Sequence, residues 1–229
     1  MKPPPASLIV FDLDGTLVDS LRDLTDASNA LLAAYGAPPL EEETVGSMVG
    51  EGASTLVERL LAARDLTAPL DEALARFLSL YDERLVHHTR PYDGIPEALR
   101  ELSASACLAV LTNKPVLAAG RILEVLDLRG FFGWVVGGDS PFGRKPDPEG
   151  LRGIMAWARK EPRHTVLVGD SAVDVRTAAN AGTRICLARY GFGYRNCPPE
   201  TLIGTELFVD EPKGLIPVLS AGHLRTLEP

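Results

Sequence analysis

The sequence predicts an α/β fold in which a doubly wound, mostly parallel sheet carries a small α-helical insert after its first strand. Apolar runs alternate with helical patterns along most of the chain, at residues 7–11, 107–111, 134–137, 165–169 and 183–188. These runs are apolar at nearly every position, which is typical of parallel strands buried on both faces. The interval between the first two runs is far longer than a strand-to-strand crossover requires. We therefore expect extra structure in that interval.

Apolar residues recur at helical spacing through this interval, and we place the insert at residues 19–90. Ser20 with Asp23 three residues later resembles a capping box, so a helix should begin there and end near Gly36. Further helical faces are formed by Leu56, Leu60 and Ala63, and by Leu70, Leu74, Phe77, Leu78, Tyr81 and Leu85. The insert would form a helical cap domain, and residues 1–18 and 91–229 the α/β core domain. Because α/β sites lie at strand carboxyl ends, we interpret the insert as a lid; the alternative is a scaffold packed on the sheet.

The C-terminal part continues the α/β pattern more weakly. We expect a loop at residues 193–204, then a last short strand at 206–210 and a short terminal helix. The pattern "RYGFGY" at 189–194 holds two glycines and is also assigned to a loop.

The composition and charge of the chain limit which partners it can bind. The formal net charge of -8 argues against nucleic acid, and an anionic substrate would need local positive charge. Cys107 and Cys186 lie in strand runs and are expected to be buried thiols. We find no secretory signal and no run long enough to span a bilayer. We expect a soluble cytoplasmic protein without a membrane partner, either a monomer or a homodimer.

Polar motifs follow the predicted strands at four places. They are Asp12-x-Asp14-Gly15-Thr16, Thr112-Asn113-Lys114, Arg144-Lys145-Pro146-Asp147-Pro148 and Gly169-Asp170-Ser171-Ala172-Val173-Asp174. The carboxyl ends of parallel strands share one edge of the sheet, so these motifs should meet in one crevice. That crevice would hold several carboxylates, a lysine, and hydroxyl and amide donors.

The pair Asp12 and Asp14 indicates the chemistry. Close carboxylates repel each other, so a cation or a shared proton must hold them. Carboxylates without histidine or thiolate are hard oxygen ligands, which suit Mg²⁺ rather than zinc. A magnesium ion would neutralise part of the repulsion and leave coordination positions for water and a substrate phosphate. Gly15 permits a backbone geometry that a Cβ would obstruct.

In the order and spacing of all four motifs the chain resembles the haloacid dehalogenase superfamily of phosphotransferases, over nearly its whole length. The resemblance implies a Rossmann-like core and Mg²⁺-dependent hydrolysis of a phosphomonoester through an aspartyl phosphate. Asp12 would attack the phosphorus, and Asp14 would protonate the leaving alcohol and then deprotonate water. Mg²⁺ would be bound by Asp12, by the backbone carbonyl of Asp14 and by Asp170.

The same resemblance implies roles for the other motif residues. Thr112 would hydrogen-bond the phosphoryl oxygens with help from Asn113. Lys145 would neutralise charge on the phosphoryl group and on the nucleophile, since phosphoryl transfer is accelerated mainly by positioning and electrostatics. Asp174 would support the metal ligands from behind or orient Lys145, and Thr16 can help to orient the site through its amide or hydroxyl.

Within the superfamily the chain is most similar to phosphoglycolate phosphatases, in "FDLDGTLVDS", "VGEGASTLVERLL" at 49–61, "TNKP" and "GDSAVDVRTAANAG". The class of substrate is then a small phosphorylated metabolite, with 2-phosphoglycolate the leading individual. We place Gly50, Glu51, Gly52 and Arg59 of the insert among the substrate-binding residues, although an acid at Glu51 is unfavourable beside a substrate carboxylate. The candidate partners for a substrate anion are Arg22, Arg59, Arg144 and Arg189.

Other activities stay open at this point. A sugar-phosphate phosphatase and a phosphomutase belong to the same superfamily, but Thr16 argues against the mutase, which usually carries a bulky apolar residue there. A catalytically silent binding or regulatory protein would keep the fold and the metal site. The intact set of Asp12, Asp14, Thr112, Lys145 and Asp170 argues against that alternative.

Overall fold

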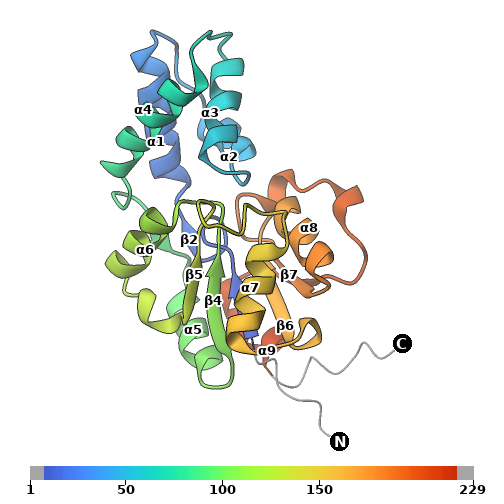
Figure 1. The fold of residues 1–229 in the computed structure, drawn as a ribbon. Coiled ribbons are helices and arrows are strands. Elements are labelled where there is room, and N and C mark those ends of the chain that lie inside the picture. The colour runs from blue at the N-terminus through green and yellow to red at the C-terminus, as the bar shows by residue number, and fades with distance from the viewer. Residues whose placement is uncertain (1–7, 221–229) are drawn as a thin grey trace, which may run out of the picture.

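The computed structural model describes residues 8–220, and its centre is a six-stranded parallel sheet (Figure 1). The strand order is β5-β4-β1-β6-β7-β8. The strands are β1 (Leu8–Phe11), β4 (Cys107–Leu111), β5 (Trp134–Val136), β6 (Thr165–Gly169), β7 (Arg184–Ala188) and β8 (Leu207–Val209). The predicted α/β class and the six predicted strands are confirmed. Residues 1–7 and 221–229 lie outside the described residues. The predicted core domain includes both segments, and the expected lack of a secretory signal concerns residues 1–7.

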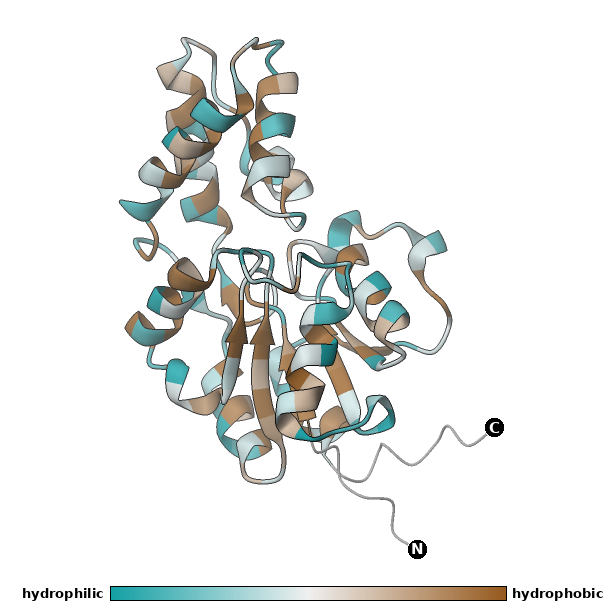
Figure 2. Ribbon diagram, in the orientation of Figure 1, coloured by the Kyte–Doolittle hydropathy of each residue, from teal (hydrophilic) through white to brown (hydrophobic). Residues whose placement is uncertain are grey.

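Helices cover both faces of the sheet, which explains why the strands are apolar at nearly every position. On one face lie α7 (Glu149–Ala158) and α8 (Ala172–Ala181); on the other lie α5 (Ile95–Ser103), α6 (Val116–Val125) and α9 (Leu215–Leu219). Alternate residues of β1 point to opposite faces. Leu8 and Val10 join the apolar cluster under α7 and α8, while Ile9 and Phe11 join the cluster under α5 and α6. Figure 2 shows the central strands in the hydrophobic colour along their length.

Strand β1 lies at the point where the strand order reverses. Its neighbours are β4 on one side and β6 on the other, both parallel to it, with Phe11 level with Val110 and Val168. The chain leaves β1 toward β4 and β5, and later returns to β6, β7 and β8. A crevice forms at the carboxyl ends of the strands beside such a reversal, which is where the predicted motifs lie.

The remaining helices form a helical unit above the carboxyl edge of the sheet (Figure 1). We use this name for α1 (Leu21–Ala34), α2 (Glu42–Met48), α3 (Ala53–Ala62) and α4 (Leu70–Asp82). An antiparallel ribbon of β2 (Val18–Asp19) and β3 (Arg90–Pro91) joins the unit to the sheet. In α4 the residues Ala73, Phe77 and Tyr81 repeat every four positions and are all buried, as an amphipathic helix requires. Helix α2, "EETVGSM", carries no apolar stripe and was not predicted.

Short 3₁₀ helices complete the chain, at Arg129–Phe131, Pro162–His164, Tyr194–Asn196, Pro199–Thr201 and Pro212–Gly214. Two of them lie within the stretch 193–204 that the sequence assigns to a loop. Within residues 8–220 no helix has the length and hydrophobicity needed to cross a bilayer.

Two local predictions are wrong. Ser20 precedes α1 but makes no capping bond to it; its hydroxyl donates to Asp14 instead, and Asp23 accepts hydrogen bonds from the backbone of His88 and Thr89. Instead of capping the helix, Ser20 bonds to the sheet edge and Asp23 ties α1 to the segment that leads into β3. Cys107, expected to be buried, is exposed because it is the first residue of β4, whereas Cys186 in the middle of β7 is buried as predicted.

Candidate active site

The site is centred on Asp12, which follows β1 directly and whose amide donates to Val168 of the neighbouring strand at 2.8 Å. Lys145, in the loop after β5, places its Nζ 2.9 Å from Asp12 Oδ1 and 2.7 Å from Asp174 Oδ1. Burial raises the pKa of Asp12 to about 7, against the lowering effect of Lys145. Burial alone would lower the pKa of Lys145, but Asp12 and Asp174 more than offset this and raise it. Lys145 is therefore a fixed positive charge against the Asp12 carboxylate.

Asp170 follows β6 and lies beside Asp12, as the shared sheet edge predicts. It is 2% exposed, and it accepts a hydrogen bond from the Gly193 amide at 2.8 Å. Burial, and after it the charges of Asp174 and Asp12, raises the pKa of Asp170 well above its ordinary value. An ionised Asp170 thus requires a positive charge, and none of the ion pairs among residues 8–220 supplies one.

Glycine backbone closes around the Asp170 carboxylate. A Cβ added to Gly15 would lie 1.9 Å from Asp170 Oδ2, one on Gly191 would lie 2.5 Å away, and one on Gly193 would lie 2.9 Å away. Gly15 also has a φ of +81°, in the left-handed region that favours glycine. The expectation that a Cβ at this position would obstruct the site is confirmed. Gly191 and Gly193, which the sequence assigned only to a loop, are part of the same cradle.

The donor set fits a divalent cation with a preference for oxygen. Carboxylate oxygens of Asp12, Asp170 and Asp174 lie within 4.8 Å of one another. Asp174 already accepts bonds from Lys145 and from the amide and hydroxyl of Ser171, which closes a capping box at the start of α8. Asp12 and Asp170 are thus the two carboxylates left to hold a metal, and hard oxygen ligands of this kind are typical of Mg²⁺ sites.

Asp14 has a different set of partners from Asp12. The hydroxyl of Ser20 donates to its Oδ1 at 2.5 Å, and Lys114 Nζ lies 3.1 Å from its Oδ2. Lys114 also donates to the hydroxyl of Tyr81 on α4 at 2.8 Å. The two charged members of this chain of contacts are nearly enclosed, with side-chain exposures of 6% for Lys114 and 13% for Asp14. The sequence motif contained Lys114, but no role was predicted for it or for Tyr81.

The motif after β4 ties the site together. Thr112 is buried at the cavity wall, and its Oγ1 accepts the amide of Lys114 at 3.2 Å. The amide group of Asn113 donates to the carbonyls of Gly50 and Lys145, and its oxygen accepts the Lys145 amide at 2.8 Å. Asn113 thereby holds the Lys145 loop and the loop of the helical unit at the same time.

Three predicted residues lie away from the reacting groups. Glu51 and Arg59 pair with each other at 2.6 Å with partly exposed side chains, and neither lines the cavity. Gly50 and Gly52 on either side of Glu51 do line it. The hydroxyl of Thr16 is buried, and among the described residues it has no hydrogen-bond partner; its amide donates to Leu13 at 3.3 Å.

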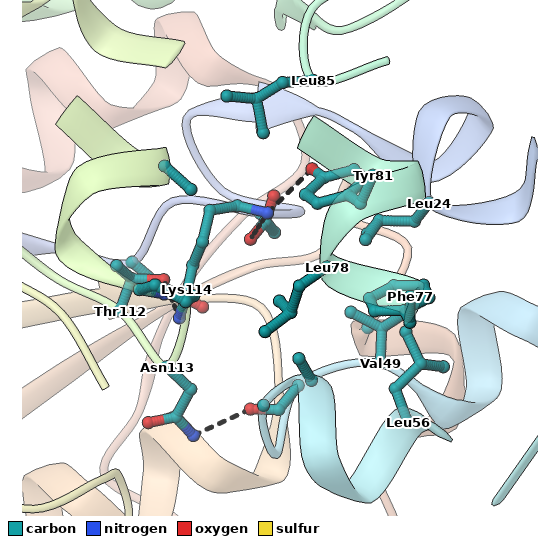
Figure 3. A pocket seen from close by; sticks show the side chains of 18 of the residues that line it. Leu24, Val49, Leu56, Phe77, Leu78, Tyr81, Leu85, Thr112, Asn113 and Lys114 are labelled. Atoms are coloured by element: carbon teal, nitrogen blue, oxygen red, sulfur yellow. Dashed lines mark hydrogen bonds and ion pairs between the residues drawn. The ribbon is translucent and has the colours of Figure 1, made fainter. Parts of the chain in front are cut away.

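These groups surround a cavity of about 340 Å³ between the sheet edge and the helical unit (Figure 3). We call its polar side the floor; it is formed by Asp12, Asp14, Thr112, Lys114 and Asp170. We call the opposite side the roof; it is formed by Leu24, Val49, Leu56, Phe77, Leu78 and Leu85 of the helical unit and its following turn. Figure 3 shows Lys114 and Tyr81 at the boundary between the two sides. Apart from Asp82 of α4, the charged side chains that line the cavity lie on the floor.

Comparison with known proteins gives consistent results. The family model described as haloacid dehalogenase-like hydrolase matches residues 9–188. A phosphoglycolate phosphatase of Caulobacter vibrioides is 39% identical over 223 residues, 93% of this chain and 92% of that protein. One from Pseudomonas putida is 37% identical over 217 residues, 92% of this chain and 78% of that protein. A crystal structure described as a "predicted phosphoglycolate phosphatase" from Haemophilus somnus superposes with a TM-score of 0.86 at 29% identity, covering 93% of this chain and 97% of that one.

Proposed function

Because the chain belongs to the haloacid dehalogenase-like hydrolases and is a phosphatase, we propose that it hydrolyses a small phosphorylated metabolite through a phosphoryl intermediate on Asp12. The observation that carries the proposal is the position of Asp12: it lies on the cavity floor, one oxygen held by Lys145 and the carboxyl group beside Asp170. A carboxylate so placed is a competent nucleophile for phosphorus.

The reaction we propose has two steps. In the first, an Asp12 oxygen forms a bond to phosphorus, the bond from phosphorus to the alcohol oxygen breaks, and that oxygen takes the proton of Asp14. In the second, water gives a proton to Asp14 and attacks the phosphorus, which releases phosphate and restores Asp12. Ser20 and Lys114 hold the Asp14 carboxyl in place for both transfers.

Thr112 and the residues around the floor supply charge and orientation. Lys145 neutralises negative charge beside Asp12, and Asp174 keeps its ammonium in position. Thr112 faces the cavity and donates to phosphoryl oxygens, while Asn113 supports the loops on either side. Asp12, Asp170 and the carbonyl of Asp14 would hold Mg²⁺, which when bound supplies positive charge against the phosphate and the floor carboxylates.

We also propose the domain division and the setting. Residues 19–90 form a cap domain over the site, and the described parts of 1–18 and 91–229 form the core domain. The bond from Asn113 to Gly50 and that from Lys114 to Tyr81 support a cap that reaches the reacting groups. A cytoplasmic location agrees with the three free cysteines.

The leading substrate is 2-phosphoglycolate, because the relatives from Caulobacter vibrioides and Pseudomonas putida are named for it. The test is phosphate release from a panel of small phosphomonoesters, with and without Mg²⁺, by the wild type and by Asp12→Asn. We expect Mg²⁺-dependent turnover with 2-phosphoglycolate ranked first, and none by the variant. Absence of turnover of every ester would favour a silent binding protein, and another ester ranked first would change the substrate but not the reaction.

A further inference from the structure

Positive charge is scarce in the cavity wall. Lys114 is the one cationic side chain among the described residues that line it. Lys145 lies behind Asp12, contacts Asp12 and Asp174, and does not line the cavity. The candidate arginines are used elsewhere: Arg22 pairs with Asp26, Arg59 with Glu51 and Arg189 with Asp210, and Arg144 donates to the carbonyl of Gly138. A substrate with a second anionic group therefore has a single cation to meet.

Lys114 has a donor to spare. An ammonium group carries three N–H bonds, and the contacts of Nζ use two of them, to Asp14 Oδ2 at 3.1 Å and to the Tyr81 hydroxyl at 2.8 Å. Tyr81 accepts in this bond, so its own O–H hydrogen is also free for an acceptor in the cavity. The Lys114 ammonium and the Tyr81 hydroxyl thus lie together at one end of the cavity, where floor and roof meet (Figure 3).

The position of these donors matches the leaving group rather than the phosphate. Asp14, in the proposed reaction, gives its proton to the oxygen that leaves phosphorus, and Lys114 touches the same carboxyl group. An anion one or two carbons beyond that oxygen would come within reach of Lys114 and Tyr81. Elsewhere the roof is apolar, formed by residues such as Leu56, Phe77 and Leu78, where an unpaired charge would be costly.

We propose that Lys114 and the Tyr81 hydroxyl bind an anionic group on the leaving-group side of the ester, and so select short phosphomonoesters that carry a carboxylate. The inference rests on the proposed function. It makes Lys114 a specificity-determining residue, whereas the sequence analysis assigned substrate binding to Glu51 and Arg59. Tyr81 acts as its partner from α4, held in place by stacking on Phe77 at 5.9 Å between ring centroids.

The test compares two esters of nearly equal size, 2-phosphoglycolate and its neutral amide, 2-phosphoglycolamide, with saturating Mg²⁺. The measured quantity is the ratio of kcat/KM for the acid to kcat/KM for the amide, because loss of the Asp14 contact affects both esters alike. We expect the wild type to prefer the acid. Lys114→Met should reduce the ratio by roughly 30-fold or more, and Tyr81→Phe by about 5-fold, as expected for loss of a charged and of a neutral partner.

Matched variants separate the effect of losing the Lys114 charge from the effects of a damaged fold and of a lost contact between the sheet edge and α4. Lys114→Arg keeps the charge and should keep a preference for the acid. The double variant Arg121→Met with Asp82→Asn removes the exposed ion pair between α6 and α4, a second link from the sheet edge to α4. It leaves no unpaired carboxylate at the cavity wall and should leave the ratio unchanged. Binding of both esters to Asp12→Asn, with and without Lys114→Met, gives the same comparison without turnover: the second substitution should weaken only the acid.

Three results would overturn the inference while the proposed function stands. They are equal wild-type rates for acid and amide, an unchanged ratio in Lys114→Met, and a ratio that falls equally in the double variant at Arg121 and Asp82. Failure of the wild type to hydrolyse any phosphate ester with Mg²⁺ is a different result, and it would overturn the proposed function and with it this inference.

Discussion

The floor and the roof of the cavity differ in how their residues are held. On the floor, Asp12 and Asp14 follow β1 and Lys114 follows β4, and each is fixed by a short contact to another charged group. The roof consists of apolar side chains on helices that reach the sheet through a two-stranded ribbon. The difference suggests a division of work. The floor carries the reaction, and the roof excludes water and limits what can be attached to the phosphate.

Loss of the proposed nucleophile should have the largest effect. Asp12→Asn removes the attacking oxygen but keeps the shape of the side chain, so we expect kcat to fall by at least about 10⁴-fold, as for other catalytic nucleophiles. The measurement is phosphate release, with circular dichroism and thermal unfolding as controls for the fold. Activity near that of the wild type in a pure preparation would remove Asp12 from the reaction.

A change in the glycine cradle should disturb the metal site next. In Gly191→Ala the new Cβ would lie 2.2 Å from the Gly15 carbonyl oxygen and 2.4 Å from Asp170 Cβ, so Asp170 must move. We expect the Mg²⁺ concentration for half-maximal activity to rise by about 10- to 100-fold, as for other groups that support metal ligands. The control is Gly120→Ala in α6, where a Cβ meets open space. Equal Mg²⁺ dependence in the two variants would contradict a metal at Asp170.

The pH dependence of stability should report on the floor, because its carboxylates titrate and the apolar side chains of the roof do not. Folding raises the pKa of Asp12 from 3.8 to about 7 and that of Asp170 well above 3.8, so the metal-free folded state binds more protons than the unfolded state in this range. Its free energy of unfolding must then fall as pH rises from about 4 to about 7. In Asp170→Asn the side chain at position 170 cannot ionise, so the free energy of unfolding should fall less steeply with pH. Urea unfolding in a chelator checks this; equal slopes for variant and wild type would contradict it, as would a steeper slope in the variant.

The smallest effect is expected at the pair that the sequence placed in substrate binding. Glu51 and Arg59 are partly exposed and pair outside the cavity, and such surface pairs contribute at most about 1 kcal/mol. Glu51→Gln should therefore change the free energy of unfolding slightly and leave the ranking of a substrate panel as in the wild type. A changed ranking would instead support the sequence-based assignment of Glu51 to substrate binding.

The sheet and the floor were predictable from sequence because both follow from one rule. Runs that are apolar at every position indicate parallel strands, and parallel strands bring their carboxyl ends to one edge. That rule alone brings Asp12, Thr112 and Asp170 together, and it also places the Lys145 loop beside them. The two glycines of "RYGFGY" follow the neighbouring strand β7 and could have been found by the same rule.

The roof could not be predicted in this way, because it depends on how helices pack on the sheet edge. The bond from Lys114 to Tyr81 joins residues of two elements whose relative position no periodicity determines. The same limit explains why the capping bond predicted for Ser20 is absent. A capping pattern predicts a local bond to α1, but the nearby carboxyl of Asp14 is a charged acceptor, and hydrogen bonds to charged groups are the stronger ones.

The central claim is that Asp12 carries the phosphoryl group, and the most direct measurement uses Asp14→Asn with p-nitrophenyl phosphate and Mg²⁺. Nitrophenolate leaves without a proton from Asp14, whereas the second step still needs Asp14 to take a proton from water, so the intermediate should accumulate. The reaction is quenched in acid and the digested protein is analysed by mass spectrometry. We predict one added phosphoryl group on Asp12, and none when Asp12→Asn is present as well. A burst of nitrophenol with Asp12 unmodified, or with the phosphoryl group on another residue, would contradict the account.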